Sequence, residues 1–470
     1  MILGVDGELL LPRTRRREGP MKIAFIGGGS FQWTVKLVAD MALNGTLEGD
    51  LVLHDINQEA LDLLARASLR AVRELGGRLD VTATTRRAEA LRGATFVILC
   101  VAIGGLEAAR NDLEIPERYG IRQSVGDTVG PGGLARGLRH IPFAVQVARE
   151  MEQACPNAWL INLTNPMTTI CRSVTRATST RTVGLCHEMD QFRKHRLAPL
   201  FEVRPEEVVL EVAGINHLPG IPRFRFRGQD GASLLRQWLT EHDRFQFIHD
   251  HAPEPARESF LDRWAVKLTL FDQLGVLFGA GDRHLAEFLP WVLTEANAWG
   301  ARYGVLLTST DDHRIVNLVN RRAWVERYVA GAPAVLEHSD EVLAEVIAAL
   351  AGGPPGRFVV NVPNQGQIDN LPRSAVVECL ADVDALGVHP VAAGALPDGA
   401  LALTAAHVAR QELIVEAALS GRREPAKSAL STDPLVRDPL TVDAMLDELC
   451  RANANFLRAE YIDGPVGKIV

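Results

Sequence analysis

The sequence lacks several features that mark common protein classes. It has no uncharged apolar run of about eighteen residues, so we expect no membrane-spanning helix. It also lacks an excess of basic charge, because 50 lysines and arginines face 58 aspartates and glutamates, for a formal net charge of −8. Non-specific nucleic-acid binding relies on a basic surface. We therefore expect neither a membrane nor a nucleic acid as partner, and chemistry on a small molecule instead.

The sequence has no Cys-x-x-Cys pair, no internal repeat and no low-complexity segment. Its six cysteines are scattered along the chain, and several fall within apolar runs. This usage suits reduced thiols rather than disulfides. We therefore expect a cytoplasmic protein without disulfides.

The chain has 470 residues, more than one hydrophobic core usually fills. At the N-terminus, Asp6 and Glu8 interrupt an apolar part that basic residues follow, whereas a secretory signal places its positive charges first. We expect a disordered extension over residues 1–20, a nucleotide-binding domain over 21–199, and a second domain over 200–470. The second domain mixes strands with long helices, and we expect it to bind substrate and to form oligomers.

A glycine turn follows the first apolar strand, residues 22–26. Gly27 and Gly29 would let the backbone approach a pyrophosphate, and the helix that follows would offer free N–H groups. The third glycine of the G-x-G-x-x-G pattern is absent, because Gln32 occupies its place. We expect this turn to bind a dinucleotide, with Ser30 and Phe31 beside it.

The next strand supports this interpretation, because residues 51–55 are apolar and end in Asp55. A carboxylate there can accept hydrogen bonds from the ribose hydroxyls, which favours NAD over NADP. Asp55 could instead cap a helix that begins near Gln58. Another buried strand, residues 94–101, brings Val101 to the same cofactor. The alternation of apolar strands with helical stretches predicts an α/β fold with a doubly wound, Rossmann-like parallel sheet.

Three further segments place reactive side chains after predicted strands. Asp127 lies in a loop with four glycines and one proline, which could press its backbone against a ligand or form a surface turn. Asn165 follows the strand 158–163 and precedes a proline, so we expect its amide to meet a ligand. Cys186 and His187 end the apolar run 181–185, which we expect to be the last parallel strand.

The second half adds candidate groups. His217 follows the apolar segment 208–216, where a histidine is more often a core residue than a ligand. Asp282, Arg283 and His284 stand together at a predicted helix start, where the aspartate could be an N-cap and the arginine a solvated charge. Candidate helices lie around 255–274 and 401–419. The run 361–372 is polar and extended, with Asp369 as its one charged residue.

These segments together resemble glycoside hydrolase family 4, the NAD-dependent glycosidases. The resemblance covers nearly all of residues 21–470. It rests, in chain order, on Gly27-Gly28-Gly29-Ser30, Asp127 in its loop, Thr164-Asn165-Pro166, Cys186-His187, Gly214-Ile215-Asn216-His217-Leu218 and Asn361-Val362-Pro363-Asn364. It implies a lactate-dehydrogenase-like nucleotide domain, a second domain that completes the active site, and a homodimer or homotetramer. It also implies a divalent ion, usually Mn²⁺, held by Cys186 and His217.

The resemblance implies a mechanism that differs from two-carboxylate glycoside hydrolysis. NAD oxidises carbon 3 of the sugar transiently, which acidifies the proton on carbon 2, and the aglycone then leaves carbon 1 before water adds. His187 is implied as the acid for the leaving group and Asp282 as the base on carbon 2. Asp127 and Asn165 are implied to hold sugar hydroxyls, and Asn165 is also expected beside NAD.

The residues after the cysteine bear on the substrate. In the family, His at the position of His187 accompanies unphosphorylated α-glycosides, whereas Asn or Asp marks 6-phosphoglycosides. Glu188 departs from the Ser of many α-glucosidases and α-galactosidases, which leaves an α-uronide in play. We expect Glu188, Arg283 and His284 to contact the sugar, with the Arg283 guanidinium clamping a uronate carboxylate.

Two other functions remain open at this point. The first is an NAD-dependent 2-hydroxyacid dehydrogenase of the lactate or malate type, which would share the nucleotide domain but has no use for Cys186 or a metal. The second is an NAD-responsive binding protein without turnover. Net NADH production with a hydroxyacid would favour the first.

Overall fold

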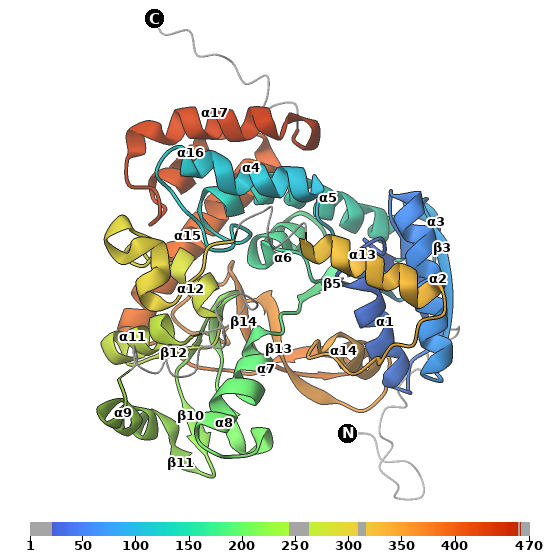
Figure 1. Cartoon of the computed structure of the whole chain (residues 1–470), viewed down its shortest axis with the longest axis horizontal. Helices are drawn as coiled ribbons and strands as arrows, with labels where there is room; N and C mark the ends of the chain where they lie inside the picture. Colours follow the sequence, from blue (N-terminus) through green and yellow to red (C-terminus); the bar gives the residue numbers. More distant parts are fainter. Residues whose placement is uncertain (1–20, 244–262, 309–315, 459–460, 462–470) are drawn as a thin grey trace, which may run out of the picture.

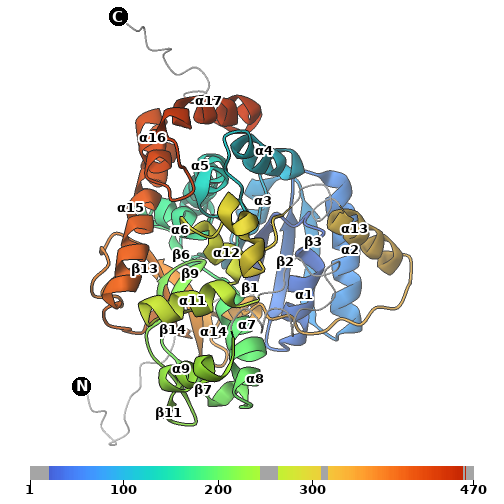
Figure 2. The ribbon, with the colours of Figure 1, turned by 60° about the vertical axis from the view of Figure 1, so that its left-hand side comes forward.

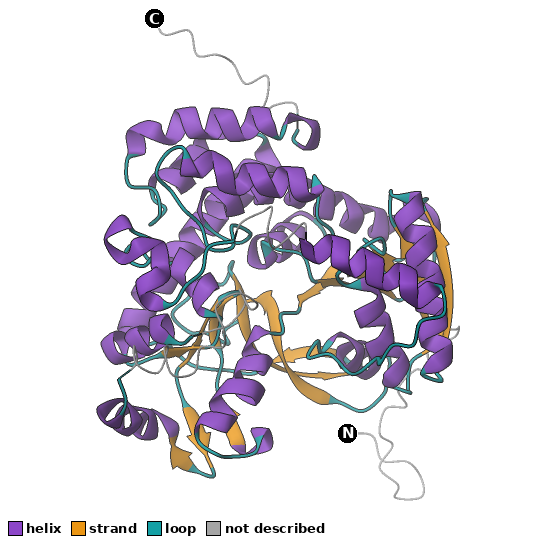
Figure 3. Ribbon diagram, viewed as in Figure 1, coloured by secondary structure: helices purple, strands orange, loops and turns teal. Residues whose placement is uncertain are grey.

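The computed structural model describes residues 21–243, 263–308, 316–458 and 461 (Figure 1). The extension expected over residues 1–20 lies outside them. A sheet of twelve strands runs through the described part, in the order β12-β9-β8-β14-β13-β6-β5-β4-β1-β2-β3, with β15 beside β14. Helices pack around it (Figure 3). The layers are those of an α/β protein, as predicted.

One half of the sheet is a doubly wound nucleotide-binding unit. Its strands are all parallel and follow the order 3-2-1-4-5-6, with the switch in direction between β1 and β4. This confirms the Rossmann-like prediction, including the place of the sixth strand as the last parallel one. The strands are β1 Met21–Ile26, β2 Glu48–His54, β3 Arg78–Thr84, β4 Phe96–Leu99, β5 Trp159–Asn162 and β6 Arg181–Gly184.

The helices of this unit connect the strands. Helix α2 has Asn57 as its N-cap, and the Asn57 side chain accepts from Ala60 N at 3.1 Å. Asn57, not Asp55, therefore caps α2, and the capping alternative for Asp55 is wrong. The helices are α1 Thr34–Leu43, α2 Gln58–Glu74, α3 Arg87–Leu91, α4 Gly105–Glu117, α5 Gly130–Ala154 and α6 Met167–Ala177.

The other half of the sheet is antiparallel and joins the first half at β6. Asn361 of β13 pairs with Gly184 of β6, so the polar run 361–372 begins inside a strand. A side chain at Gly184 would meet Met167, Asn361 and Cys171, so glycine permits the close approach. The strands are β8 Ala213–Ile215, β9 Leu218–Ile221, β12 Leu277–Phe278, β13 Gly356–Pro363, β14 Val376–Asp384 and β15 Gly387–Pro390.

The predicted strand before His217 is interrupted in the structure. Residues 208–210 form β7 of a separate small sheet with β10 Phe224–Phe226 and β11 Gln229–Asp230, and β8 begins at Ala213. The candidate helix around 401–419 is α15. Of the candidate helix around 255–274, the structure describes residues 263–274, and residues 265–274 form α11. The remaining helices are α7 Glu188–Phe192, α8 Ala198–Leu200, α9 Gly231–Glu241, α11 Ala265–Leu274, α12 Asp282–Glu287, α13 Val316–Val329, α14 Leu343–Leu350, α15 Asp398–Ser420, α16 Arg423–Ser431 and α17 Val442–Ala452.

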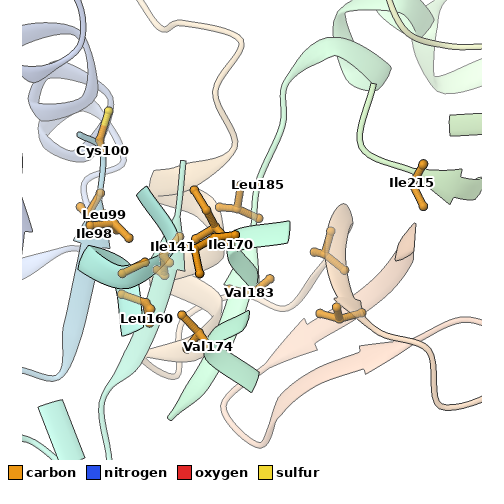
Figure 4. Close-up of a cluster of buried hydrophobic side chains, with 14 of the residues drawn as sticks. Ile98, Leu99, Cys100, Ile141, Leu160, Ile170, Val174, Val183, Leu185 and Ile215 are labelled. Atoms are coloured by element: carbon orange, nitrogen blue, oxygen red, sulfur yellow. The ribbon is translucent and has the colours of Figure 1, made fainter. Parts of the chain in front are cut away.

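A continuous apolar core fixes the edge of the sheet where β4, β5 and β6 end. Its central side chains are fully buried, and burial of each contributes about 1.5 to 3 kcal/mol. Figure 4 shows strand residues Leu99, Leu160 and Val183 with helix residues Ile141, Ile170 and Val174. Ile215 of β8 belongs to the same core, which therefore extends across both halves of the sheet.

Helix α13, from the second half of the chain, packs against α2 of the nucleotide-binding unit (Figures 1 and 2). Tyr328 is buried there, and its hydroxyl donates to Glu74 at 2.7 Å. The expected boundary at residue 199 stays a prediction, and α13, from beyond it, packs against the first unit. Among the described helices, none is long and apolar enough to cross a membrane.

Candidate active site

The glycine turn after β1 is shaped for close backbone approach. Gly27 has φ +98°, and a Cβ there would lie 1.9 Å from the Cys100 carbonyl oxygen. Gly29 N donates to Asp55 Oδ2 at 2.9 Å, and a Cβ on Gly29 would lie 2.6 Å from that oxygen. Asp55 therefore touches the glycine turn directly, and only glycine fits opposite it. The cradle suits the pyrophosphate and ribose of a dinucleotide.

The other residues expected beside the dinucleotide lie around this turn. Ser30 N donates to Gly27 O at 3.2 Å, which closes the turn before α1 begins. The Phe31 ring has the Arg322 guanidinium of α13 at 5.7 Å. Val101 N donates to Thr164 Oγ1 at 3.0 Å, which ties the ends of β4 and β5 together. Contact of these residues with NAD stays a prediction.

Asp127 is the centre of a hydrogen-bond network between loops. Its Oδ1 accepts from Thr128 Oγ1 at 2.7 Å, and its Oδ2 accepts from Asn165 Nδ2 at 3.1 Å. Thr128 Oγ1 also lies 2.8 Å from His217 Nδ1. The buried Asn165 Oδ1 has no hydrogen-bond partner within the described residues. A buried acceptor without a partner suits a ligand hydroxyl, which matches the role expected of Asn165.

His217 occupies the tight turn between β8 and β9. It has φ +63°, a left-handed conformation that is uncommon for a residue other than glycine and that recurs at functional sites. Its ring stacks on that of His284, with centroids 3.7 Å apart and planes 5° apart. His284 Nδ1 lies 2.7 Å from Glu188 Oε1. The second half of the chain thus delivers two imidazoles to the loops that follow β5 and β6.

The two histidines differ in charge. Burial and the positive charge of His284 lower the pKa of His217 to about 4. For His284, burial alone would lower the pKa, but the negative charge and hydrogen bond of Glu188, with Asp127, raise it to about 9. Neutral His217 therefore keeps a lone pair for a metal, whereas His284 carries a positive charge.

A divalent ion fits this arrangement. Ligand atoms of Asp127, His217 and His284 all lie within 4.8 Å of one another. Carboxylate oxygen and imidazole nitrogen are donors that suit Mn²⁺ and related ions. His217 was expected as a ligand from the sequence, whereas Asp127 and His284 were expected to contact the sugar.

Cys186 lies close by but outside that convergent group. Its thiol is buried, and burial, with the charges of Glu378 and Glu188, raises its pKa well above the usual value. The Asn216 side chain, next to His217 in the chain, acts in the opposite direction and lowers the pKa of the thiol. Loss of the thiol proton would have to accompany metal binding. The Cys186–His217 ligand pair stays a prediction.

His187 makes a contact that the sequence did not indicate. Its Nδ1 lies 2.9 Å from Glu341 Oε1, and Glu341 also accepts from Lys36 Nζ at 3.3 Å. Burial alone would lower the pKa of His187, but the hydrogen bond and charge of Glu341 raise it. Its side chain is 29% exposed, so the imidazole can meet a ligand.

Asp282 and Arg283 are both hydrogen-bonded to backbone groups. Both Asp282 oxygens accept N–H groups at the start of α11, from Val266 at 2.9 Å and Lys267 at 3.1 Å. Asp282 therefore caps α11 rather than the helix that it begins. Its role as the base on carbon 2 stays a prediction.

The Arg283 guanidinium joins two loops. It donates to Leu306 O at 3.1 Å and to Ser124 O at 2.7 Å, and it also contacts Thr308 Oγ1. The side chain is buried, not solvated. These bonds favour a loop-holding role over the expected uronate clamp, which stays a prediction.

Four residues that sequence reasoning missed support the site. Glu287 accepts from Val125 N at 2.6 Å and Gly126 N at 2.8 Å, which holds the loop of Asp127. Glu378 accepts from Asn216 and Asn361 side chains. Thr128 could have been found from its place beside Asp127. Glu287, Glu378 and Glu341 stand in no motif, and only the fold brings them to the site.

Two family models match the chain over most of its length. The model described as family 4 glycosyl hydrolase matches residues 22–200, and that described as its C-terminal domain matches residues 212–436.

Named relatives span nearly the whole chain. An alpha-galacturonidase of Thermoanaerobacterium saccharolyticum is 35% identical over 427 residues, which cover 88% of this chain and 91% of that protein. An alpha-galacturonidase of Bacillus subtilis is 34% identical and covers 89% and 94%. An alpha-galactosidase of the same organism is 30% identical and covers 93% and 99%.

Solved structures share the fold. The Bacillus subtilis protein lplD, described as a glucosidase, superposes with a TM-score of 0.84 at 31% identity, over 92% of this chain and 99% of that one. A 6-phospho-beta glucosidase of Thermotoga maritima, solved with manganese, NAD⁺ and glucose-6-phosphate, has a TM-score of 0.75 at 25% identity, over 93% and 100%.

Proposed function

The chain belongs to glycosyl hydrolase family 4, and we propose that it hydrolyses unphosphorylated α-glycosides, with α-galacturonides as the main substrates. Names of the relatives support the sugar class, since two alpha-galacturonidases are 34 to 35% identical over most of this chain. α-Galactosides and α-glucosides are the neutral competitors. The observation that carries the proposal is the convergence of Asp127, His217 and His284 beside the Cys186-His187-Glu188 segment.

We propose NAD and a divalent ion, Mn²⁺ by preference, as cofactors. The glycine cradle of Gly27 and Gly29 against Asp55 would hold NAD, and His217 with Cys186 or with Asp127 and His284 would hold the ion. When bound, NAD supplies reversible hydride exchange at carbon 3 and the ion supplies Lewis-acid polarisation.

The remaining chemistry belongs to side chains of the chain. Asn165 and Asp127 would hold sugar hydroxyls, the first through its unpartnered Oδ1. His187 would donate its proton to the glycosidic oxygen as the bond from carbon 1 breaks, and Asp282 would take the proton from carbon 2. The positive charge of His284 and that of Arg136, whose Nε donates to Asn165 O at 2.9 Å, would offset a uronate carboxylate.

A panel of nitrophenyl α-glycosides tests the proposal. The full-length protein is assayed with NAD, Mn²⁺ and a thiol reductant on α-galacturonide, α-glucuronide, α-galactoside and α-glucoside. We expect the highest kcat/KM on α-galacturonide, loss of activity with a chelator, and no net NADH. A preference for a neutral sugar would refute the uronide assignment, and no release from any glycoside would refute the function.

The dehydrogenase alternative is not favoured, because both family models describe glycosyl hydrolases. It predicts net NADH from a 2-hydroxyacid, which the same samples can test. An NAD-responsive binding protein predicts no turnover on any substrate of the panel.

We also propose that the enzyme works in the cytoplasm as a homodimer or homotetramer. Six free cysteines, all buried, are consistent with a reducing compartment. Light scattering on the purified protein measures the oligomer directly, and a monomer at micromolar concentration would contradict this part of the proposal.

A further inference from the structure

Glu341 lies far from His187 in the chain but contacts it in the fold. It follows α13, on the segment that leads back to α14, and its side chain is 7% exposed. Its Oε1 lies 2.9 Å from His187 Nδ1 and 3.3 Å from Lys36 Nζ. The contact fixes one ring nitrogen of His187 against a carboxylate and leaves Nε2 on the opposite edge of the ring.

The segment that carries Glu341 is itself anchored. Asp40 of α1 is fully buried, and its Oδ1 accepts from Ser339 N at 2.7 Å. Ser339 Oγ donates to the other Asp40 oxygen and accepts from Glu341 N at 3.1 Å. The Glu341 carboxylate is therefore held from a rigid helix of the nucleotide-binding unit, which limits its freedom to leave His187.

We propose that Glu341 is the positioning residue for His187. The Glu341 carboxylate accepts Nδ1–H and so presents Nε2–H to the glycosidic oxygen. The imidazolium gives this proton to the oxygen as the bond between that oxygen and carbon 1 breaks, and the neutral imidazole is reprotonated from water. A carboxylate behind an imidazole sets its tautomer and orientation and stabilises its charged form. This inference rests on the proposed function.

A merely structural role for Glu341 makes a different prediction. As an ion-pair partner of Lys36, it would join α1 to the returning segment, and its loss would affect all substrates equally. A positioning role acts through proton donation instead. Proton donation matters most when the aglycone is a poor leaving group, and little when the aglycone leaves readily as a nitrophenolate.

The experiment compares Glu341→Gln and Glu341→Ala on 4-nitrophenyl and methyl α-galacturonides. If the panel finds another preferred sugar, its glycosides replace them. General-acid assistance is worth about 10² to 10⁴ in rate. We expect each variant to lose at least about tenfold more kcat/KM on the methyl glycoside than on the nitrophenyl glycoside. Equal losses on both would overturn the proposal.

Asp340→Asn is the matched control. Asp340 is the neighbouring residue, and its Oδ1 makes the same kind of contact with His195 Nε2, at 2.9 Å. His195 takes no part in the proposed chemistry, so the ratio between the two substrates should stay as in the wild type. A double variant of Glu341→Ala with His187→Gln should lose no more than His187→Gln alone, and an additive loss would overturn the proposal.

A second readout needs no turnover. With ¹⁵N-labelled histidine, the imidazole spectrum of the wild type should show His187 Nδ1 protonated in the neutral ring as well as in the imidazolium, assigned by comparison with His187→Gln. Glu341→Ala should change that pattern, and an unchanged pattern would overturn the proposal. A wild type that cleaves no glycoside would refute the proposed function, while the spectrum would still decide whether Glu341 controls the imidazole.

Discussion

Oε1 of Glu188 lies 2.7 Å from Nδ1 of His284, and the two residues come from opposite halves of the sheet. Each side chain is 18% exposed. The ion pair explains why two stacked imidazoles can coexist, because Glu188 keeps the charge on His284 while His217 stays neutral. Glu188 therefore holds the charged ring of the stacked histidine pair, and its contact with the sugar stays a prediction.

We predict that Glu188→Gln destabilises the protein. The substitution leaves the His284 charge without its partner, which for a largely buried pair costs about 3 kcal/mol. Urea unfolding of the metal-free protein measures the free energy of unfolding. Combining Glu188→Gln with His284→Gln should restore at least about 1 kcal/mol relative to the sum of the single losses. Strict additivity would show that the pair contributes no coupling.

The sequence predicted these residues one by one but not their pairing. Cys186, His187 and Glu188 follow an apolar run, and such a run marks the end of a buried parallel strand. The contact between Glu188 and His284 brings α12, which follows β12, against α7, which follows β6. Four strands separate β12 from β6 in the sheet, so no local pattern encodes this contact. Glu341 shows the same limit, because 154 positions separate it from His187 (341 − 187) and its segment has no periodic pattern.

Glu287 should give the protein a pH-dependent stability. Burial raises its pKa to about 7 from an ordinary value of 4.5. Between these two values the native state holds a proton that the unfolded state has released, so the stabilisation is present below pH 4.5 and is lost as pH rises through 7. A pKa rise of this size corresponds to about 3 kcal/mol in the free energy of unfolding. Unfolding of metal-free protein across pH 4.5 to 8 measures it.

Glu287→Gln and Glu287→Ala separate the charge from the loop contact. The glutamine side chain can still accept hydrogen bonds from Val125 N and Gly126 N, but it does not titrate. The free energy of unfolding of Glu287→Gln should therefore lack the pH dependence that Glu287 gives the wild type, and the difference between the two profiles isolates that contribution. Alanine frees the loop of Asp127 and should lower kcat/KM at least about tenfold. A wild type and glutamine variant with parallel pH profiles would contradict the raised pKa.

Metal binding should distinguish the two candidate ligand sets. We expect Cys186→Ser and His217→Ala each to weaken Mn²⁺ binding at least about tenfold, because a removed ligand is replaced by a weaker one or by water. His284→Gln should weaken binding by less than about threefold, since its charge disfavours coordination. Calorimetry with NAD present measures the affinities. A larger loss in His284→Gln than in Cys186→Ser would assign the ion to Asp127, His217 and His284.

The fold itself was largely predictable up to β6. Continuous apolar runs such as 22–26 and 158–163 are typical of strands buried on both faces, and the glycine turn and the intervening helical stretches select parallel order. Beyond β6 the prediction was coarser. The strand before His217 proved to be two short strands in different sheets, separated by Glu211 and Val212, and Glu211 is the one charged residue of the run 208–216.

Arg283→Met tests whether the guanidinium binds substrate or holds loops. If Arg283 clamps a uronate, Arg283→Met should lose turnover of α-galacturonide far more than turnover of α-galactoside, because only the uronide carries the carboxylate. The observed bonds to Leu306 O and Ser124 O lead us to expect similar losses on both sugars, with a free energy of unfolding lower by about 2 kcal/mol, since buried carbonyls lose their donors. The measurements are kcat/KM on both nitrophenyl glycosides and urea unfolding. Arg136→Met is the comparison. Arg136 lies beside Asn165, so this variant should lose turnover mainly of the uronide. A selective loss of uronide turnover in Arg283→Met, at unchanged stability, would restore the clamp and place the carboxylate against α12.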